Sequence, residues 1–228
     1  MRTTNLPAAL AAALLLALPA AVLADGGAPA PSPSSSIPTP ELTPEQRADQ
    51  HYNRGIKLRE KAWELEEKAA KAGAGERAKL EAKTEKTYRK AIREYESAVD
   101  LDPRHYRAYS DLGYALRKVG DYEASLAAYD TALAMVPTYA EAVEYRGEAY
   151  LGLGRLDDAK EAYLQLFAGD RERAETLMGA MQEWVEQHRE DPGAHDPATV
   201  EAFADWVSQR AHLADQTASL TELEERRW

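Results

Sequence analysis

Residues 104–137 read RHYRAYSDLGYALRKVGDYEASLAAYDTALAMVP, and residues 138–171 read TYAEAVEYRGEAYLGLGRLDDAKEAYLQLFAGDR. Each stretch is 34 residues long, and without a gap the two are identical at seven positions, Ala108, Gly113, Ala115, Gly120, Ala128, Tyr129 and Ala134 of the first stretch. A period of this length is typical of solenoids whose repeating unit is a pair of helices. The chain is therefore predicted to contain a helical repeat.

The hydrophobic residues of the first stretch follow a helical period. Its first stripe consists of Tyr109, Leu112, Gly113 and Leu116, at i, i+3, i+4 and i+7. Gly120 and Asp121 interrupt the pattern, and a second stripe follows until Pro137 ends it. We expect Gly113 where the two helices approach closely, because a larger side chain there would push them apart.

At these residues the chain resembles the tetratricopeptide repeat family. The resemblance covers Tyr109, Leu112, Gly113, Leu116, Leu126, Tyr129, Ala132 and Pro137 in one unit, and Val143, Gly147, Tyr150, Ala159 and Tyr163 in the next. It implies an all-α, right-handed solenoid of helical hairpins that binds other proteins. We expect about three units within residues 44–173, at about 44–103, 106–139 and 140–173.

The first unit is longer than the other two. Its glycine is Gly55, and the 58 residues from Gly55 to Gly113 exceed the repeat period by 24 residues. The extra segment, at about residues 60–87, is rich in Lys, Glu and Ala, which favour helices, and the sequence AGAG at residues 72–75 interrupts it. We therefore expect both helices of this unit to be elongated by about 12 residues, or about 18 Å, as a charged antiparallel arm.

Two interpretations of this arm remain open. Pairs of opposite charge at i and i+4, such as Glu64 and Lys68, would stabilise the arm by itself. Alternatively, Trp63 and Leu65 would contact a partner protein.

Helix-capping patterns support the predicted boundaries. Thr43 and Thr138 each begin a Thr-x-x-Gln/Glu capping box, and Asp196 precedes a proline at the first helical position. Two further helices within residues 174–217 are expected to cover the exposed hydrophobic end of the solenoid. Residues 218–228 are expected to form a tail.

The N-terminus has the pattern of a signal peptide over residues 1–24, with one positive charge at Arg2, an Ala- and Leu-rich stretch and small residues before Asp25. Cleavage is predicted after Ala24. Residues 25–43 are rich in Pro, Ser and Ala and are expected to form a disordered tether. The protein is then an exported protein of bacterial type, periplasmic or secreted, which would be held at a membrane only if the leader stayed uncleaved.

In the tetratricopeptide repeat family, the first helix of each unit lines a concave groove that receives peptides. Counted from the glycine of each unit, the resemblance implies these groove residues: Tyr52, Ile56 and Arg59, then Arg107, Ser110, Tyr114 and Arg117, then Glu141, Glu144 and Glu148. The Lys/Asn clamp of the chaperone-binding members is absent, because none of its positions holds Lys or Asn here. The groove should instead favour an extended segment of mixed charge, unless the three glutamates merely solvate the surface.

The composition narrows the class of partner. The 228 residues include 39 acidic and 28 basic side chains and no cysteine, with a formal charge of -11. The acidic excess argues against nucleic-acid binding, and the lack of cysteine excludes a lipid anchor on cysteine. Residues 45–103 carry 14 basic and 13 acidic groups, whereas residues 174–228 carry 4 and 12. A basic partner should therefore be steered to the C-terminal end.

No catalytic motif is recognisable, and no cofactor is expected. One cluster, from His188 to Asp196 and including His195, could hold a metal, although His and Asp are also common at helix ends. The sequence thus predicts a non-catalytic interaction scaffold of the cell envelope, whose partner is another protein or a peptide segment. The alternatives are a metal-dependent or hydrolytic accessory domain at this cluster, and a homo-oligomeric adaptor built through the arm or through Trp184 and Trp206.

Overall fold

The computed structural model describes residues 41–193 and 195–225, so that the predicted signal peptide (1–24) and most of the predicted tether (25–43) lie outside the described residues. The described part contains eight α-helices and no strand. They are α1 (Pro44–Lys71), α2 (Ala74–Leu101), α3 (Tyr106–Lys118), α4 (Tyr122–Met135), α5 (Ala140–Gly152), α6 (Leu156–Gly169), α7 (Arg171–Glu190) and α8 (Pro197–Glu225). Within this part, no helix is both long and apolar enough to cross a membrane.

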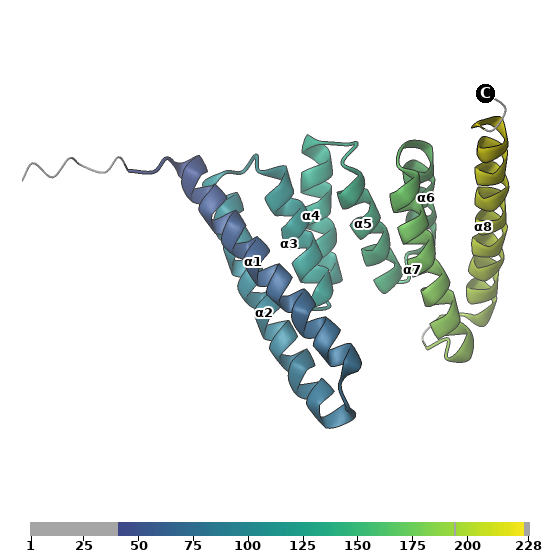
Figure 1. The fold of residues 1–228 in the computed structure, drawn as a ribbon, viewed down its shortest axis with the longest axis horizontal. Helices are drawn as coiled ribbons and strands as arrows, with labels where there is room; N and C mark the ends of the chain where they lie inside the picture. Colours follow the sequence, from purple (N-terminus) through teal and green to yellow (C-terminus); the bar gives the residue numbers. More distant parts are fainter. Residues whose placement is uncertain (1–40, 194, 226–228) are drawn as a thin grey trace, which may run out of the picture. The chain divides into compact units, whose positions relative to one another are not determined.

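Consecutive helices pair as hairpins, and successive hairpins stack (Figure 1). The first helices of the hairpins, α1, α3, α5 and α7, also contact one another in order, so they form one continuous layer. The predicted all-α solenoid of helical hairpins is confirmed. Helices α7 and α8, predicted only as a cap, form a fourth hairpin that extends this layer.

The first hairpin is about twice as long as the next one (Figure 1). Helices α1 and α2 have 28 residues each, against 13 in α3 and 14 in α4. Gly73 lies at the N-cap of α2, where a residue with little helix propensity ends one helix and allows the next to begin. The elongation predicted from the 24 extra residues is therefore present in both helices.

The first residues of the predicted arm (60–87) contact α3, as does Arg59 just before it. Along α1, Arg59 pairs with Asp111, the Trp63 indole N–H donates to the Tyr114 hydroxyl at 2.7 Å, and Glu66 pairs with Lys118 at 2.8 Å. Lys118 is the last residue of α3, so the hairpin passes beyond α3 only after Glu66.

One of the two interpretations of the arm has Leu65 in contact with a partner, and the structure does not support this for Leu65. Its side chain is only 5% exposed. The residues of α1 that are buried with it, Gly55, Ala62 and Ala69, recur at intervals of seven and so lie on one face of the helix. Leu65 therefore belongs to the interior of the hairpin.

The helix ends follow the predicted caps with one exception. Thr43 forms both hydrogen bonds of a capping box with Gln46, and Asp196 caps α8 by accepting from the Thr199 N–H at 3.3 Å. Thr138 does not cap α5: the N-cap is Tyr139, whose hydroxyl donates to the Glu141 carboxylate at 2.8 Å. The glutamate that the predicted capping box needed is thus bound elsewhere.

The C-terminal helix is longer than predicted. Helix α8 extends to Glu225 and so includes most of the segment predicted as a tail, while residues 226–228 lie outside the described part.

The glycine of the repeat makes room for a tyrosine of the same hairpin. Tyr95 and Tyr129 are fully buried, and their rings lie against Gly55 and Gly113. A Cβ atom added at Gly113 would lie 2.7 Å from the nearest ring atom of Tyr129. The predicted close approach at Gly113 is confirmed, and Gly55 is shown to be its equivalent in the first hairpin.

Replacing Gly113 by alanine should lower the free energy of unfolding by about 1–3 kcal/mol, because the buried Tyr129 ring cannot yield to the added methyl group. Gly179→Ala is the matched control, since Gly179 lies inside α7 with nothing within 4 Å of an added Cβ. It should stabilise the protein by up to about 1 kcal/mol through helix propensity alone. Urea titrations measure both changes, and equal signs for the two variants would contradict this account.

Candidate binding groove

Each pair of neighbouring first helices is joined by an ion pair between an arginine and a carboxylate. Arg59 of α1 pairs with Asp111 of α3. Arg117 of α3 pairs with Glu148 of α5 at 2.5 Å, and Arg173 of α7 pairs with Glu144 of α5 at 2.6 Å. We call these three pairs the arginine row. It places four of the ten predicted groove residues (Arg59, Arg117, Glu144 and Glu148) and the newly found Asp111 and Arg173 along one layer.

The glutamates of α5 are therefore not a free acidic cluster. Glu144 is buried and bound to Arg173, while Glu148 is bound to Arg117. Glu141 accepts from Tyr139 and lies 3.9 Å from Arg173. The interpretation that these residues merely solvate the surface is wrong for Glu144 and Glu148.

Burial raises the pKa values of two carboxylates of the arginine row, Asp111 and Glu144. Removal from water raises the pKa of Asp111 to about 6, although the charge of Arg59 acts in the opposite direction. Burial likewise raises the pKa of Glu144, against the hydrogen bond from Arg173. In both cases the cost of desolvating a carboxylate outweighs the attraction of its arginine, so the row depends on keeping each pair intact.

Aromatic rings lie beside the arginine row. Trp63 and Tyr114 meet edge to face with ring centroids 6.0 Å apart, and Tyr145 follows at 5.0 Å from Tyr114. The Arg59 guanidinium lies 4.7 Å from the centre of the Trp63 ring, and that of Arg117 lies 5.3 Å from the centre of Tyr114. Cation–π contacts of this kind hold both partners in fixed orientations.

The predicted groove residues differ in what they offer to a ligand. Ser110 and Tyr114 are buried at 1% and 8% exposure and so form the floor of the layer. Tyr52 and Ile56 are half-buried, and Arg107 is exposed, with its Nε 3.1 Å from the Tyr106 hydroxyl. Exposed and half-buried residues, not the buried ones, are therefore the ones that a partner can reach.

Three residues of this layer were missed by the sequence reasoning. Asp111 and Tyr145 lie on the predicted first helices, next to Ser110 and Glu144 in the sequence, and a search for an acceptor for each arginine would have pointed to Asp111. Arg173 was missed because α7 was assigned to the cap. No local signal marks α7 as a member of the layer, since that depends on its packing against α5.

A polar pocket of about 350 Å³ lies where the layer reaches α7. Arg117 and Glu148 lie at one side of it, and Glu183, Gln187 and His188 of α7 lie at the other. The pocket is lined by positively and negatively charged side chains and by the Gln187 amide, so it could receive a polar side chain of a bound segment.

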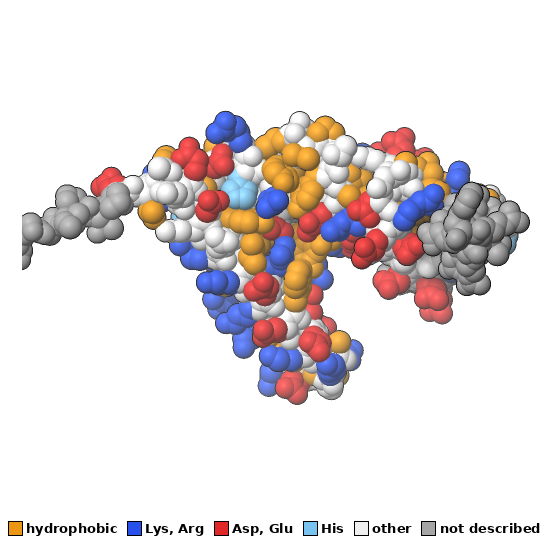
Figure 2. Space-filling view, turned by 45° about the horizontal axis from the view of Figure 1, so that its top comes forward, with side chains coloured by type: hydrophobic (Ala, Val, Ile, Leu, Met, Phe, Trp, Pro, Cys, Tyr) orange, Lys and Arg blue, Asp and Glu red, His pale blue; other side chains and the backbone are white. Residues whose placement is uncertain are grey.

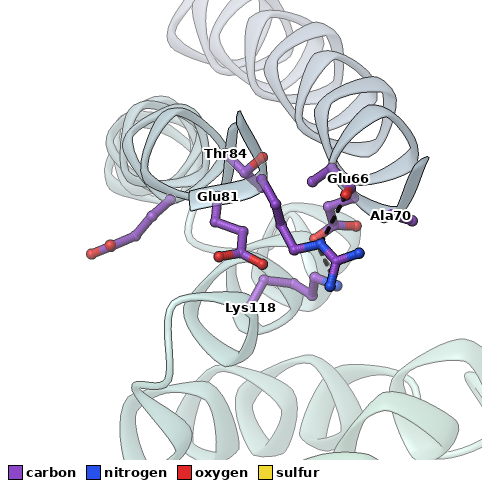
Figure 3. A pocket seen from close by; sticks show the side chains of 8 residues that line it. Glu66, Ala70, Glu81, Thr84 and Lys118 are labelled. Atoms are coloured by element: carbon purple, nitrogen blue, oxygen red, sulfur yellow. Dashed lines mark hydrogen bonds and ion pairs between the residues drawn. The ribbon is translucent and has the colours of Figure 1, made fainter. Parts of the chain in front are cut away.

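A second pocket, of about 540 Å³, lies where the first hairpin passes the end of α3. Figure 3 shows Glu66 of α1, Glu81 and Thr84 of α2 and Lys118 of α3 around it. The ion pair between Lys118 and Glu66 joins α3 to the hairpin here. The buried Thr84 hydroxyl has no hydrogen-bond partner among the described residues. The sequence reasoning gave no indication of this pocket.

The histidines of the predicted metal cluster pack on a tryptophan. His188 stacks on Trp184 with centroids 3.9 Å apart and an interplanar angle of 15°, and His195 meets the same ring at 5.2 Å. A ring nitrogen of His188 lies 2.8 Å from the Trp184 carbonyl oxygen. In the described residues, no group of three or more His, Cys, Asp or Glu side chains is arranged to hold a metal ion. The geometry therefore does not favour the metal-dependent alternative.

The family model of the tetratricopeptide repeat matches this chain twice, over residues 76–140 and 110–174. The matched residues run from the start of α2 to the start of α7, so the second to sixth helices resemble tetratricopeptide repeats. Such repeats are protein-interaction modules, and their fold is generally a non-catalytic scaffold. The match ends at residue 174 and so does not include most of the α7–α8 hairpin, which the structure adds to the same layer.

The chain is also similar to several solved structures. These include the first such domain of Spaghetti (RPAP3) bound to the HSP90 peptide SRMEEVD, with 23% identity, coverage of 54% of this chain and 93% of that one, and a TM-score of 0.39. The first domain of human RPAP3 is 18% identical, with coverage of 60% of this chain and 96% of that one and a TM-score of 0.41. The MamA protein is 21% identical, with coverage of 74% of this chain and 90% of that one and a TM-score of 0.43. A search of the curated proteins finds no match.

Proposed function

We propose that this protein is a tetratricopeptide repeat scaffold of the cell envelope, without catalytic activity, that holds an extended segment of a partner protein along α1, α3, α5 and α7. The observation that carries the proposal is the arginine row, which runs without a gap across these four helices. The open edges of the row, at Glu148 and Arg173, and the half-buried Tyr145 beside it give a ligand charged and aromatic surface.

The partly exposed members of the layer define the chemistry of the segment. Arg173 is 33% exposed at its side chain, Glu141 is 27% exposed, and Tyr145 is half-buried. Charged side chains of either sign can contact these groups at their open edges while the ion pairs stay closed. A partner segment that alternates basic, acidic and aromatic residues fits this surface better than a uniformly charged one.

Site-specific photocrosslinking in the expressing cell tests the groove. A photoreactive residue at Arg107 or at Gln187 should trap the same partner, because both positions are exposed and lie on two helices of the layer, α3 and α7. The matched controls are Glu96 and Glu161, which are exposed on the second helices α2 and α6. Equal yields from the controls and the groove positions would refute binding along this layer.

The location in the cell envelope rests on the leader sequence and is tested separately. The intact mass of the purified protein should correspond to a chain that begins at Asp25. The protein should also be released with the periplasmic fraction or the medium. A chain that retains Met1 and fractionates with the cytosol would contradict this part of the proposal. It would not bear on binding along the groove.

A further inference from the structure

A stripe of positive charge runs along α2. Its members are Lys79, Lys83, Lys86, Lys90 and Arg93, at intervals of four, three, four and three residues. This spacing places all of them on one face of the helix. All five are exposed, and none forms an ion pair among the described residues.

Two lysines of α1 widen this stripe into a face. His51 and Arg54 of α1 both contact Glu94 of α2, at 2.9 and 2.8 Å, which sets the register of the antiparallel hairpin. Counted in that register, Lys57 stands opposite Lys90 along the two helices, and Lys61 stands opposite Lys86; both lysines of α1 are exposed. We call these residues together with the α2 stripe the basic face.

The basic face points away from the rest of the solenoid. Helix α1 turns Arg59 and Trp63 toward α3, and Lys57 and Lys61 are each two residues, or about 200°, from these contacts. Figure 2 shows the Lys and Arg side chains along the edge of the hairpin that faces away from the other helices. The basic face is thus the N-terminal end of the stacked hairpins.

The net charge of the first hairpin does not indicate the basic face. The 14 basic and 13 acidic groups of residues 45–103 nearly cancel. The structure separates them, because Glu66 pairs with Lys118 on the side of α3 and Glu81 lines the pocket on that same side. Near the basic face, Glu94 is bound to Arg54 and His51, and Glu64 lies 3.8 Å from Lys68. Glu60 and Glu96 are exposed at its border and lower its net positive charge without removing it.

The other end of the stack carries the opposite charge. On α7, Glu172, Glu175, Glu186 and Glu190 are exposed and form no ion pair among the described residues. Helix α7 turns Arg173 and Trp184 toward α5, and Glu175 and Glu186 are each two residues, or about 200°, from these contacts. We call the four glutamates the acidic face.

The two faces match in extent but cannot meet within one molecule. The basic stripe from Lys79 to Arg93 covers about 21 Å of helix. The acidic face from Glu172 to Glu190 covers about 27 Å, with two of its glutamates near each end. Helices α1 and α2 pack on each other and on α3, whereas α8 packs on α7, so α3 to α6 separate the two ends.

We propose that the basic face of one molecule docks on the acidic face of a second copy, so that the solenoid continues from one chain into the next. The argument is charge complementarity between two surfaces of the same chain. Because the two faces are different, the contact is heterologous and propagates in a row instead of closing a symmetric dimer. The association is electrostatic, so salt should weaken it.

Sedimentation velocity over a range of protein concentrations tests the proposal with the protein as cells process it. At about 0.1 M salt the Debye length is about 10 Å, which screens the repulsion between the net charges but leaves direct contacts. We expect a concentration-dependent series of oligomers here and monomers at about 1 M salt, where the Debye length is about 3 Å.

Charge reversal supplies the decisive comparison. Lys83→Glu with Lys86→Glu and Lys90→Glu should abolish self-association, and so should Glu175→Lys with Glu186→Lys and Glu190→Lys. A mixture of the two variants should associate again, because the reversed faces complement each other. All six positions are exposed on helices, and circular dichroism checks that both variants keep their helix content.

Several results would overturn the proposal. They are a monomer at every concentration, self-association that charge reversal leaves unchanged, and failure of the mixture to associate. Binding of the basic face to phosphatidylglycerol vesicles without self-association would assign it to a lipid surface instead. None of the six substitutions touches the arginine row, so crosslinking from the groove reports on the proposed function independently.

Discussion

Replacing Asp111 by alanine should lower the free energy of unfolding by about 3–5 kcal/mol, because it leaves the Arg59 guanidinium without its partner. The Arg59 side chain is 15% exposed and that of Asp111 is 6% exposed, so water cannot take the place of the carboxylate. The pair also joins the elongated hairpin to α3. Urea titration at pH 7 measures the change in midpoint at constant slope.

Asp130→Ala is the matched control for this substitution. Asp130 pairs with Arg146 at 2.8 Å, but its side chain is 59% exposed. Its removal should cost less than about 1 kcal/mol, as is usual for surface pairs. If the two variants lose the same stability, burial does not decide the strength of the arginine row.

The Arg59–Asp111 pair should also make the stability depend on pH. The pKa of Asp111 is raised from its ordinary value of 3.8 to about 6 in the folded protein, so the folded state holds the proton more tightly than the unfolded state. Its contribution is fully present below about pH 4 and is lost as the pH rises through about 6. The stability of the wild-type protein relative to Asp111→Asn should therefore fall between pH 4 and pH 7.

Replacing Trp184 by alanine should cost about 3–5 kcal/mol, and the damage should be confined to the C-terminal hairpin. The ring is 7% exposed and packs edge to face on Phe203 of α8 at 5.4 Å. Its indole N–H donates to the Leu151 carbonyl of α5 at 3.0 Å, so one side chain joins three helices. Because each hairpin contacts mainly its neighbours, α1 and α2 should keep their stability.

Hydrogen exchange resolved by segment tests this locality. Amides of α7 and α8 should lose protection in Trp184→Ala, while those of α1 to α3 should not. Trp184→Phe keeps most of the ring and removes the hydrogen bond, so it should cost only about 1–2 kcal/mol. Uniform loss of protection along the chain would show that the solenoid unfolds as a single unit.

The fold could be predicted from the sequence because its determinants are local and repeated. The 34-residue period, the tyrosines at 95, 129 and 163 and the glycines at 113 and 147 define the hairpins, and Thr43 and Asp196 define two helix starts. These signals depend on helical periodicity and on capping chemistry within a few residues. The same signals failed at Thr138, where Tyr139 competed for the capping glutamate.

The binding surface could be predicted only in part. The helix phase correctly placed residues such as Arg117 and Glu148 on the first helices, but it could not show that they bind each other. It also allowed Leu65 as a contact residue, although its side chain is buried in the folded protein. The helical period of the sequence gives the side of the helix on which a residue lies. The residue that it contacts depends on how the neighbouring helix packs.

The sequence by itself determined the repeat, the elongated first hairpin and the composition of each segment. Only the tertiary structure decided which charges are neutralised and which remain available. It binds Glu144 and Glu148 of α5 in ion pairs and adds α7 to the layer of first helices. It also leaves the lysines along α2 exposed and without ion pairs among the described residues, although the first hairpin is nearly neutral as a whole. The physical reason is that charges act through space, so their effect depends on distances that helix stacking sets and that the order of residues alone does not contain.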